Sequence, residues 1–220
     1  MIRIDPHIHS VYSGDARGTP REILRRASAV GLDAVAVADH NTMKGSIIAL
    51  KESRGMGITV VPAMELSTSA GHIVALGIQE EISRGLTPVE TLDEIHDQDG
   101  VAIIPHPFVR YRQGLFVNER NIRVDAIETL NSRYIVGYSN WRARKFARKR
   151  GIPEIGASDA HFLEAVGSSF TLVDSEGEAD DIVRAILKGK TEPAGSRTPL
   201  PLIVREVINK KLLGRMRDYV

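Results

Sequence analysis

Short apolar runs alternate with helix-like segments along most of this chain. Leu32–Ala38 is nearly all apolar, which is typical of a strand buried on both faces of a parallel sheet. Thr19–Glu22 and Thr87–Glu90 read as helix starts, with a threonine cap, a proline in the first turn and a glutamate that completes a capping box. Alternating strands and helices imply right-handed βαβ units. The pattern predicts an α/β protein whose parallel sheet forms either a barrel or an open doubly wound sheet.

The expected elements cover most of the chain. Strands are predicted at Ile2–His9, Leu32–Ala38, Ile58–Met64, His72–Ile78, Val101–Ile104, Val124–Leu130, Ile152–Ala157 and Ser169–Val173. Helices are predicted at Pro20–Val30, Met43–Arg54, Pro88–Gln98, Tyr138–Lys149 and Asp180–Lys188. The segment His72–Ile78 follows a turn rich in serine and glycine, so it can pair with the preceding strand as a hairpin.

Two histidines stand two residues apart at the end of the first strand. Alternate residues of a strand point to the same face, so His7 and His9 should converge on one point. Two imidazoles at one point suit a transition-metal ion. The alternative is an ordinary pair of polar residues that closes a strand.

Other strands also end in residues that can carry chemistry. These residues are His40, Glu65, His106, Asp159 and His161. Singly, each could be a helix cap, an exposed acid or a turn residue. In parallel α/β folds the C-terminal strand ends share one face, which holds the active site. Their common position therefore predicts one site, whereas His96, inside a predicted helix, is expected to be a surface or structural residue.

The composition narrows the classes of function. The chain has 220 residues and no cysteine, which excludes disulfides, cysteine-bound zinc and cysteine nucleophiles. A net charge of +1 argues against strong overall attraction to nucleic acid or membranes. The sequence has no signal-peptide pattern and no apolar run of membrane-spanning length. We therefore expect a cytoplasmic protein with no membrane partner.

Histidine and carboxylate without thiolate are ligands that suit Zn, Mn or Fe. The candidate set is His7, His9, His40, Glu65, His106, Asp159 and His161. These are too many ligands for one ion, so two or three divalent ions with a bridging carboxylate are implied. Adjacent cations stabilise phosphoryl displacement and generate hydroxide near neutral pH.

These residues carry a family resemblance. The motifs Asp5-x-His7-x-His9-Ser10, Ala38-Asp39-His40, Glu65, Pro105-His106-Pro107 and Ser158-Asp159-Ala160-His161 resemble those of the PHP (polymerase and histidinol phosphatase) family, in the family's order. The resemblance covers about residues 1–195. It implies a single-domain, distorted seven-stranded (β/α)7 barrel, TIM-barrel-like, with a two- or three-metal site.

The resemblance also implies a distribution of ligands. The first metal would be held by His7, His9, Glu65 and Asp159; the second by Glu65, His106 and His72; the third by Asp15, His40 and His161. The chain departs from the family at two positions. Asp15 stands where many members carry histidine. Asn131 stands where other members place another histidine ligand, so the second site would use Asn131, His72 or water.

Substrate contacts are expected in the loops that follow these strands. Arg17, Arg110 and Arg133 could each pair with a phosphate, as could Arg112, and Ser67 and Ser69 could donate to one. The alternative for each is an ordinary solvated side chain. The basic helix Trp141–Arg150 interleaves aromatic residues with cations, so it could steer nucleic acid, or it could pack on the barrel.

The last part of the chain forms a separate unit in this interpretation. The segment Gly189–Pro201 is rich in glycine, proline, serine and threonine and is the candidate boundary. We expect a barrel over residues 1–195 and a basic amphipathic tail over 196–220. The apolar residues of that tail would pack on the barrel or on a partner subunit.

The sequence therefore predicts a metal-dependent phosphoesterase. The leading hypothesis is hydrolysis of a small-molecule phosphomonoester, with a nucleotide as one candidate, by a metal-bound hydroxide. The alternatives are a nuclease or exonuclease, for which nucleic acid would be the partner, and a non-catalytic metal-binding interaction module. The oligomeric state is not predicted.

Overall fold

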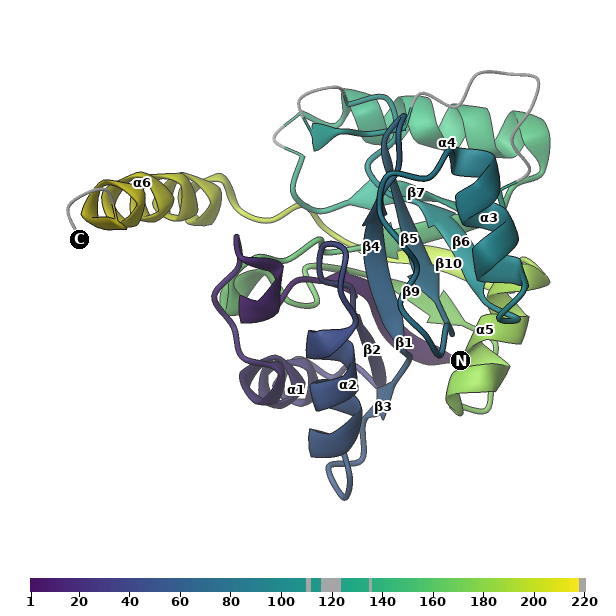
Figure 1. Ribbon diagram of the computed structural model, residues 1–220, viewed down its shortest axis with the longest axis horizontal. Helices are drawn as coiled ribbons and strands as arrows, with labels where there is room; N and C mark the ends of the chain where they lie inside the picture. The colour runs from purple at the N-terminus through teal and green to yellow at the C-terminus, as the bar shows by residue number, and fades with distance from the viewer. Residues whose placement is uncertain (110–111, 116–123, 135, 218–220) are drawn as a thin grey trace.

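The computed structural model describes residues 1–109, 112–115, 124–134 and 136–217, with side chains as far as residue 208. It has a mixed α/β fold in which the described strands form two five-stranded sheets (Figure 1). The predicted α/β class is therefore confirmed. Within the described ranges, none of the helices combines the length and hydrophobicity that crossing a bilayer requires.

The first sheet contains the N-terminal strand. In spatial order it comprises β10 (Thr191–Gly195), β9 (Ser169–Val173), β1 (Ile2–Ile8), β2 (Ala34–Val37) and β3 (Thr59–Val60). Strand β1 lies at its centre, parallel to β2 and antiparallel to β9. Because β1 has a neighbour on each side, both of its edges are hydrogen-bonded and its end is firmly placed.

The second sheet is continuous in sequence order. It comprises β4 (Ala63–Ser67), β5 (His72–Leu76), β6 (Val101–Ile104), β7 (Ala126–Asn131) and β8 (Glu154–Ala157). Strands β4 and β5 form an antiparallel hairpin, as the sequence suggested, while β6, β7 and β8 are parallel.

Backbone hydrogen bonds join the two sheets at two places. At one junction His40 forms an isolated bridge with Glu65, whose N–H donates to the carbonyl of Asp39 at 3.0 Å. At the other, Ile8 bridges Ala160, and the N–H of His9 donates to the Ala160 carbonyl at 2.9 Å. Both junctions therefore lie at residues that the sequence singled out. The described strands do not form one continuous barrel ladder.

The described part of the chain contains six α-helices. They are α1 (Pro20–Ala29), α2 (Lys44–Glu52), α3 (Pro88–His96), α4 (Tyr138–Arg150), α5 (Ala179–Leu187) and α6 (Leu200–Arg217). Both predicted capping boxes are present, because Thr19 bonds reciprocally with Glu22 and Thr87 with Glu90. Helices α1 and α2 lie side by side next to β2, and α6 extends away from the body (Figure 1).

Apolar side chains from both sheets fill the space between them. Ile4, Leu76, Ile155 and Val173 are fully buried in this cluster, and Ile186 of α5 packs with them. Interiors packed at crystal-like density resist displacement of individual side chains. The core therefore holds the strand ends, and the polar residues on them, in fixed positions.

The structure corrects three expectations about strands. The sheets are not wholly parallel, because β5, β9 and β10 run antiparallel to neighbours. The single strand expected at Ile58–Met64 is two strands in different sheets, interrupted at Pro62, which has no N–H to donate to a ladder. Glu65 consequently lies in the middle of β4 rather than at a strand exit.

Gly45, in the first turn of α2, packs closely against Asp39 and Ser10. A Cβ at Gly45 would lie 1.9 Å from Oδ2 of Asp39 and 2.5 Å from Oγ of Ser10. Asp39 accepts hydrogen bonds from the N–H and hydroxyl of Ser10, both at 2.6 Å. We expect Gly45→Ala to lower the free energy of unfolding by roughly 2–4 kcal/mol, since it overpacks the site and breaks buried bonds.

Chemical denaturation measures this effect. Gly137→Ala is the matched control, because a Cβ there has open space within 4 Å and φ is −72°. It should change stability by less than about 0.5 kcal/mol. Equal stabilities of the two variants would contradict the account of Asp39.

Candidate metal centre

The two histidines of the first strand meet as the sequence predicted. Their Nε2 atoms lie 3.0 Å apart, and both side chains are buried. His7 belongs to β1 and His9 follows it directly, so both inherit the position of a central strand. On its other side, Nδ1 of His7 lies 2.7 Å from a carboxylate oxygen of Glu128, a residue of β7.

The carboxylate of Glu65 lies at the centre of the cluster. Its Oε1 is 2.9 Å from Nδ1 of His72 and 3.0 Å from Nε2 of His106. Its Oε2 is 2.9 Å from Nδ1 of His40. The histidines within 3.5 Å of this carboxylate are His7, His9, His40, His72 and His106. Glu65 lies in mid-strand opposite Val74 of β5, and its other side bridges His40, so its carboxylate lies where the two sheets meet.

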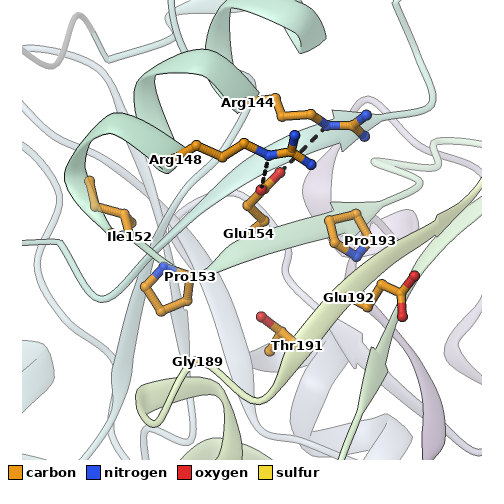
Figure 2. A pocket seen from close by; sticks show the side chains of 10 residues that line it. Arg144, Arg148, Ile152, Pro153, Glu154, Gly189, Thr191, Glu192 and Pro193 are labelled. Carbon is orange, nitrogen blue, oxygen red and sulfur yellow. Dashed lines mark hydrogen bonds and ion pairs between the residues drawn. The ribbon is translucent and has the colours of Figure 1, made fainter.

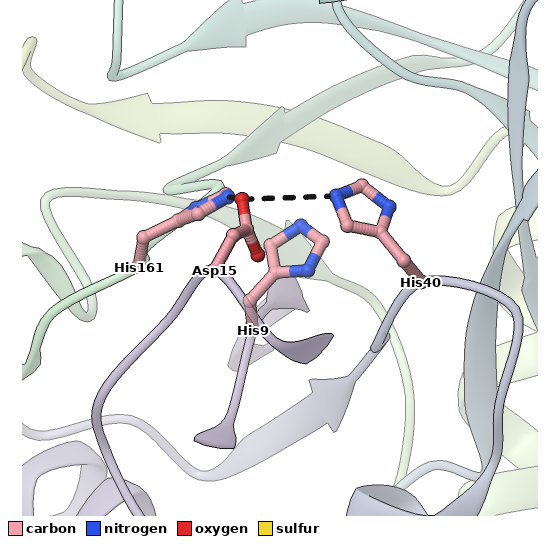
Figure 3. A group of neighbouring side chains, drawn as sticks. All are labelled: His9, Asp15, His40 and His161. Atoms are coloured by element: carbon pink, nitrogen blue, oxygen red, sulfur yellow. Dashed lines mark ion pairs between the residues drawn. The ribbon is translucent and has the colours of Figure 1, made fainter. Parts of the chain in front are cut away.

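A second group forms on the opposite side of His9. Asp15 Oδ2 lies 2.8 Å from Nε2 of His161 and 3.9 Å from Nε2 of His40 (Figure 3). His9, Asp15, His40 and His161 each offer one ligand atom within 4.8 Å of the others. His7, His9 and Asp159 form a further such group, as do His40, Glu65 and His72. His9 and His40 each belong to two groups, so the groups are contiguous.

Two arginines approach Asp159 from the rim. Arg112 pairs with its Oδ2, and Nη1 of Arg133 lies 3.6 Å from its Oδ1. Asn131 donates from its amide to the same Oδ2 at 3.0 Å and to Glu128 at 2.8 Å. The amide oxygen of Asn131, its only ligand atom, already accepts the N–H of Arg133. The structure therefore places Asn131 beside Asp159, with its amide nitrogen bonded to that carboxylate.

The donor set fits divalent cations. Among the described residues, Oδ1 of Asp159 and Nδ1 of His106 are buried without a hydrogen bond. Buried polar atoms are rarely left so, and an ion is one group that satisfies them. The described residues that line the surrounding cavity of about 400 Å³ include four carboxylates and two guanidiniums, those of Arg112 and Arg133. Its formal charge is negative when the histidines are neutral, which favours positive guests.

Mutual electrostatics set the protonation of these groups. Burial alone would raise the pKa of Glu65, but His7 and His106 lower it well below its ordinary value. Burial lowers the pKa of His9, and neighbouring His161 lowers it further. Glu65 is therefore charged and His9 neutral near pH 7, which are the states that metal ligands require.

His7 shows that positive charge is favoured at this point. Burial acts to lower its pKa, yet the carboxylates of Glu65, Asp159 and Glu128 raise it well above the ordinary value. The same three carboxylates would stabilise a cation placed beside this ring.

The predicted substrate-binding residues lie at different distances from the central cavity. Arg133 lines the central cavity, with Nη1 2.9 Å from Nδ1 of His161. Ser67 ends β4 and bonds to Asn41, and its Oγ lies 3.4 Å from Nε2 of His72. Arg17 is exposed and lines an adjoining cavity. Arg110 lies outside the described residues. As expected, His96 lies apart from the cluster, where it pairs with Asp125.

Sequence reasoning missed several residues that shape this centre. Glu128 was read only as part of a strand, although a glutamate inside an apolar run is itself a signal of buried function. Its Oε2 accepts the N–H of His106 at 2.8 Å. Glu206, from α6, lies 2.9 Å from Nη2 of Arg133. That contact joins segments 73 residues apart, and no local pattern encodes it.

Part of the basic helix α4 is engaged elsewhere. Arg144 and Arg148 converge on Glu154, which begins β8, in a cavity of about 460 Å³ (Figure 2). Since β8 ends beside Asp159, this cavity lies at the other end of the strand from the metal centre. Lys145 stands over the Trp141 ring and Arg142 over Phe108. Many cations of α4 thus have partners within the fold.

Comparison with known proteins agrees with this geometry. The family model described as PHP domain matches residues 5–94, and the one described as PHP-associated matches residues 137–191. The uncharacterized protein MJ1587 of Methanocaldococcus jannaschii is 34% identical over 149 residues, covering 63% of this chain and 87% of that protein. The chain belongs to the PHP domain family, as its motifs predicted.

Solved structures share the fold. One is a two-domain protein from Bacteroides vulgatus containing a predicted PHP-like metal-dependent phosphoesterase, with a TM-score of 0.73 and 17% identity over 95% of this chain and 69% of that one. Another is an amidohydrolase from Chromobacterium violaceum with bound sulfate and no metal. It has a TM-score of 0.60 and 16% identity over 92% of this chain and 96% of that one.

Glu128 provides a test of how the centre is held. In Glu128→Gln the amide that replaces Oε2 can no longer accept the His106 N–H, and the negative charge beside His7 is lost. Partners that orient ligating histidines typically contribute 10–100-fold to metal affinity. We expect the affinity for Mn²⁺ or Zn²⁺ to fall by about that factor in a calorimetric titration.

Glu154→Gln is the control for this experiment. It removes a partly buried glutamate that pairs with Arg148 at the far end of β8. Its metal affinity should equal that of the unmodified protein. If Glu128→Gln also bound metal normally, Glu128 would have no part in the centre.

Proposed function

We propose that this chain is a metal-dependent phosphoesterase that hydrolyses a phosphomonoester, with a nucleotide among the candidate substrates. The observation that carries the proposal is the charge of the central cavity. A phosphomonoester carries close to two negative charges at neutral pH. When the lining histidines are neutral, a cavity with four carboxylates and two guanidiniums would repel it. Two or three divalent ions in the three contiguous ligand groups would reverse that charge.

The candidate ligands divide by position. His7, His9 and Asp159 form one group, His40, Glu65 and His72 the second, and His9, Asp15, His40 and His161 the third. His106 contacts Glu65 and adds a further nitrogen. Zn, Mn or Fe bound there would supply Lewis acidity for water activation and positive charge for the phosphoryl oxygens.

The remaining residues of the site orient the candidate metal ligands or bind the phosphate of the substrate. Glu128 holds the His7 ring through Nδ1, and Asn131 fixes the carboxylate of Asp159. Arg133 lines the cavity, where Glu206 and His161 hold its guanidinium in place, and it is the candidate phosphate-binding cation because guanidinium forms charge-assisted bonds with phosphate oxygens. Arg112 is engaged with Asp159, so its role in this proposal is to orient that ligand.

We also propose that the two sheets belong to one distorted barrel domain over residues 1–195. The backbone bonds at His40–Glu65 and Ile8–Ala160 support this, since they join the sheets at both junctions. Residues 196–220, which include α6, would form an appended tail. Its start is anchored by the N–H of Thr198, which donates to the carbonyl of Ser132 at 2.8 Å.

Metal content and turnover test the proposal together. Elemental analysis of gently purified protein should find two to three transition-metal ions per chain. His7→Ala, Glu65→Ala and Asp159→Ala should each remove most phosphomonoester hydrolysis yet leave a cooperative unfolding transition, because the apolar core lies apart from these residues. Near-normal turnover of all three variants at saturating metal would refute the site assignment.

An exonuclease is the second candidate, and one observation favours it. Tyr138 and Trp141 of α4 are both more than half exposed, with ring centroids 5.7 Å apart, beside several cations. Exposed aromatics flanked by cations can stack nucleobases. A nuclease that used this face would lose affinity steeply with salt.

We expect Trp141→Ala to leave phosphomonoester turnover within about twofold of the unmodified value, because the ring is half exposed on α4 and does not line the central cavity. The same assays should be run with single-stranded DNA and RNA at salt concentrations between about 50 and 200 mM, a range over which binding through phosphate contacts weakens strongly. Degradation of either polymer faster than any mononucleotide, with loss in Trp141→Ala, would favour the exonuclease.

A further inference from the structure

Two cavities adjoin at the rim of the metal centre. The first, described above, holds the ligand groups. The second has a volume of about 360 Å³ and lies between α6 and the 3-10 helix Leu163–Ala165. Both are lined by His161 and Glu206. We infer that the second cavity binds the leaving group of the phosphomonoester, an inference that rests on the proposed function.

The boundary between the two cavities, formed by His161 and Glu206, is where we expect the scissile bond of the substrate to lie. Nη1 of Arg133 lies 3.0 Å from Nε2 of His161, while its Nη2 lies 2.9 Å from Glu206. The guanidinium therefore lies against the boundary between the cavities, because its opposite nitrogens contact Glu206 and His161, which line both. A phosphoryl group bound at Arg133 would thus lie beside the two residues that the cavities share.

Apolar side chains form much of the wall of the second cavity. Phe162 and Leu163 come from the loop after β8, and Leu202 comes from the first turn of α6. All three side chains are only partly exposed. An apolar portion of a leaving group would remove its own surface and theirs from water, which is favourable.

The charges of the second cavity offer no net attraction to an anionic leaving group. It is lined by two cations, Arg17 and Arg205, and by three carboxylates, those of Glu22, Glu164 and Glu206. Arg205 is paired with Glu164, and Glu206 with Arg133. Arg17 is then balanced by Glu22, so a second phosphate there would find no unmatched cation. The substrate class is thus a phosphomonoester of an uncharged, largely apolar alcohol, such as an aryl alcohol.

A substitution at Leu202 distinguishes binding of the leaving group in the second cavity from a general structural role of α6. The experiment uses the full-length, metal-loaded protein and compares kcat/KM for 2-naphthyl phosphate with that for methyl phosphate. In Leu202→Ala the ratio of the two should fall about tenfold, the usual effect of removing apolar pocket contact. Val204→Ala is the matched control, because Val204 lies on the same helix, is 47% exposed and does not line the cavity. It should keep the unmodified ratio.

A binding measurement makes the outcome independent of turnover. Calorimetry with 2-naphthylphosphonate and methylphosphonate should show about tenfold preference for the aryl compound, lost in Leu202→Ala and kept in Val204→Ala. A 2-naphthylphosphonate that carries a sulfonate on its distal ring should bind more weakly than the parent. Glu164→Gln, which removes one carboxylate from the lining, should narrow that difference.

The outcomes separate the two claims. Absence of hydrolysis of both esters, with preferential aryl phosphonate binding that depends on Leu202, would refute the phosphoesterase proposal and support the cavity as a ligand site. Hydrolysis of both esters with no effect of Leu202→Ala on either ratio would overturn the leaving-group inference alone. Tighter binding of the sulfonated compound would overturn the assignment of an uncharged leaving group.

Discussion

The buried carboxylate of Glu65 is the interaction on which the rest of this centre depends. It brings five imidazoles from separate parts of the chain within 3.5 Å of one side chain. A charged carboxylate in a water-poor interior is costly unless it is paired. The stabilisation therefore has to come from the histidines and from whatever cations they hold. Fold and chemistry are coupled here, because the backbone of Glu65 also joins the two sheets.

Most of the centre could be predicted from the sequence because its residues sit on short, local patterns. His7 and His9 alternate on one strand, and Asp159 and His161 follow another, so strand periodicity and the common face of strand ends are sufficient. Glu65 was found for a partly wrong reason, since its strand is broken at Pro62 and the residue lies within β4. The residue nevertheless lies in the expected cluster, because β4 brings its carboxylate within 3.5 Å of the five histidines.

Other features could not be predicted because they depend on distant segments. Glu128 is recognisable only once β7 is seen beside β1 and β6, where its two oxygens serve His7 and His106. Glu206 reaches Arg133 from a tail whose apolar face alone was expected to pack. The tail does pack through Ile203 and Glu206, but Val204, Val207 and Ile208 remain about half exposed. An amphipathic pattern specifies a face and leaves open what lies against it.

The pairing of β1 has a consequence for how the protein is made. Ile2 is registered against Val173, and His9 is fixed by the carbonyl of Ala160. The first strand is synthesised long before either partner, so α1 and β2 are the native neighbours available to it early. Contacts so far apart in sequence form slowly. During synthesis the imidazoles of the first strand are thus exposed to cellular metals before their carboxylate partners arrive, and a nascent chain would gain from binding metal last.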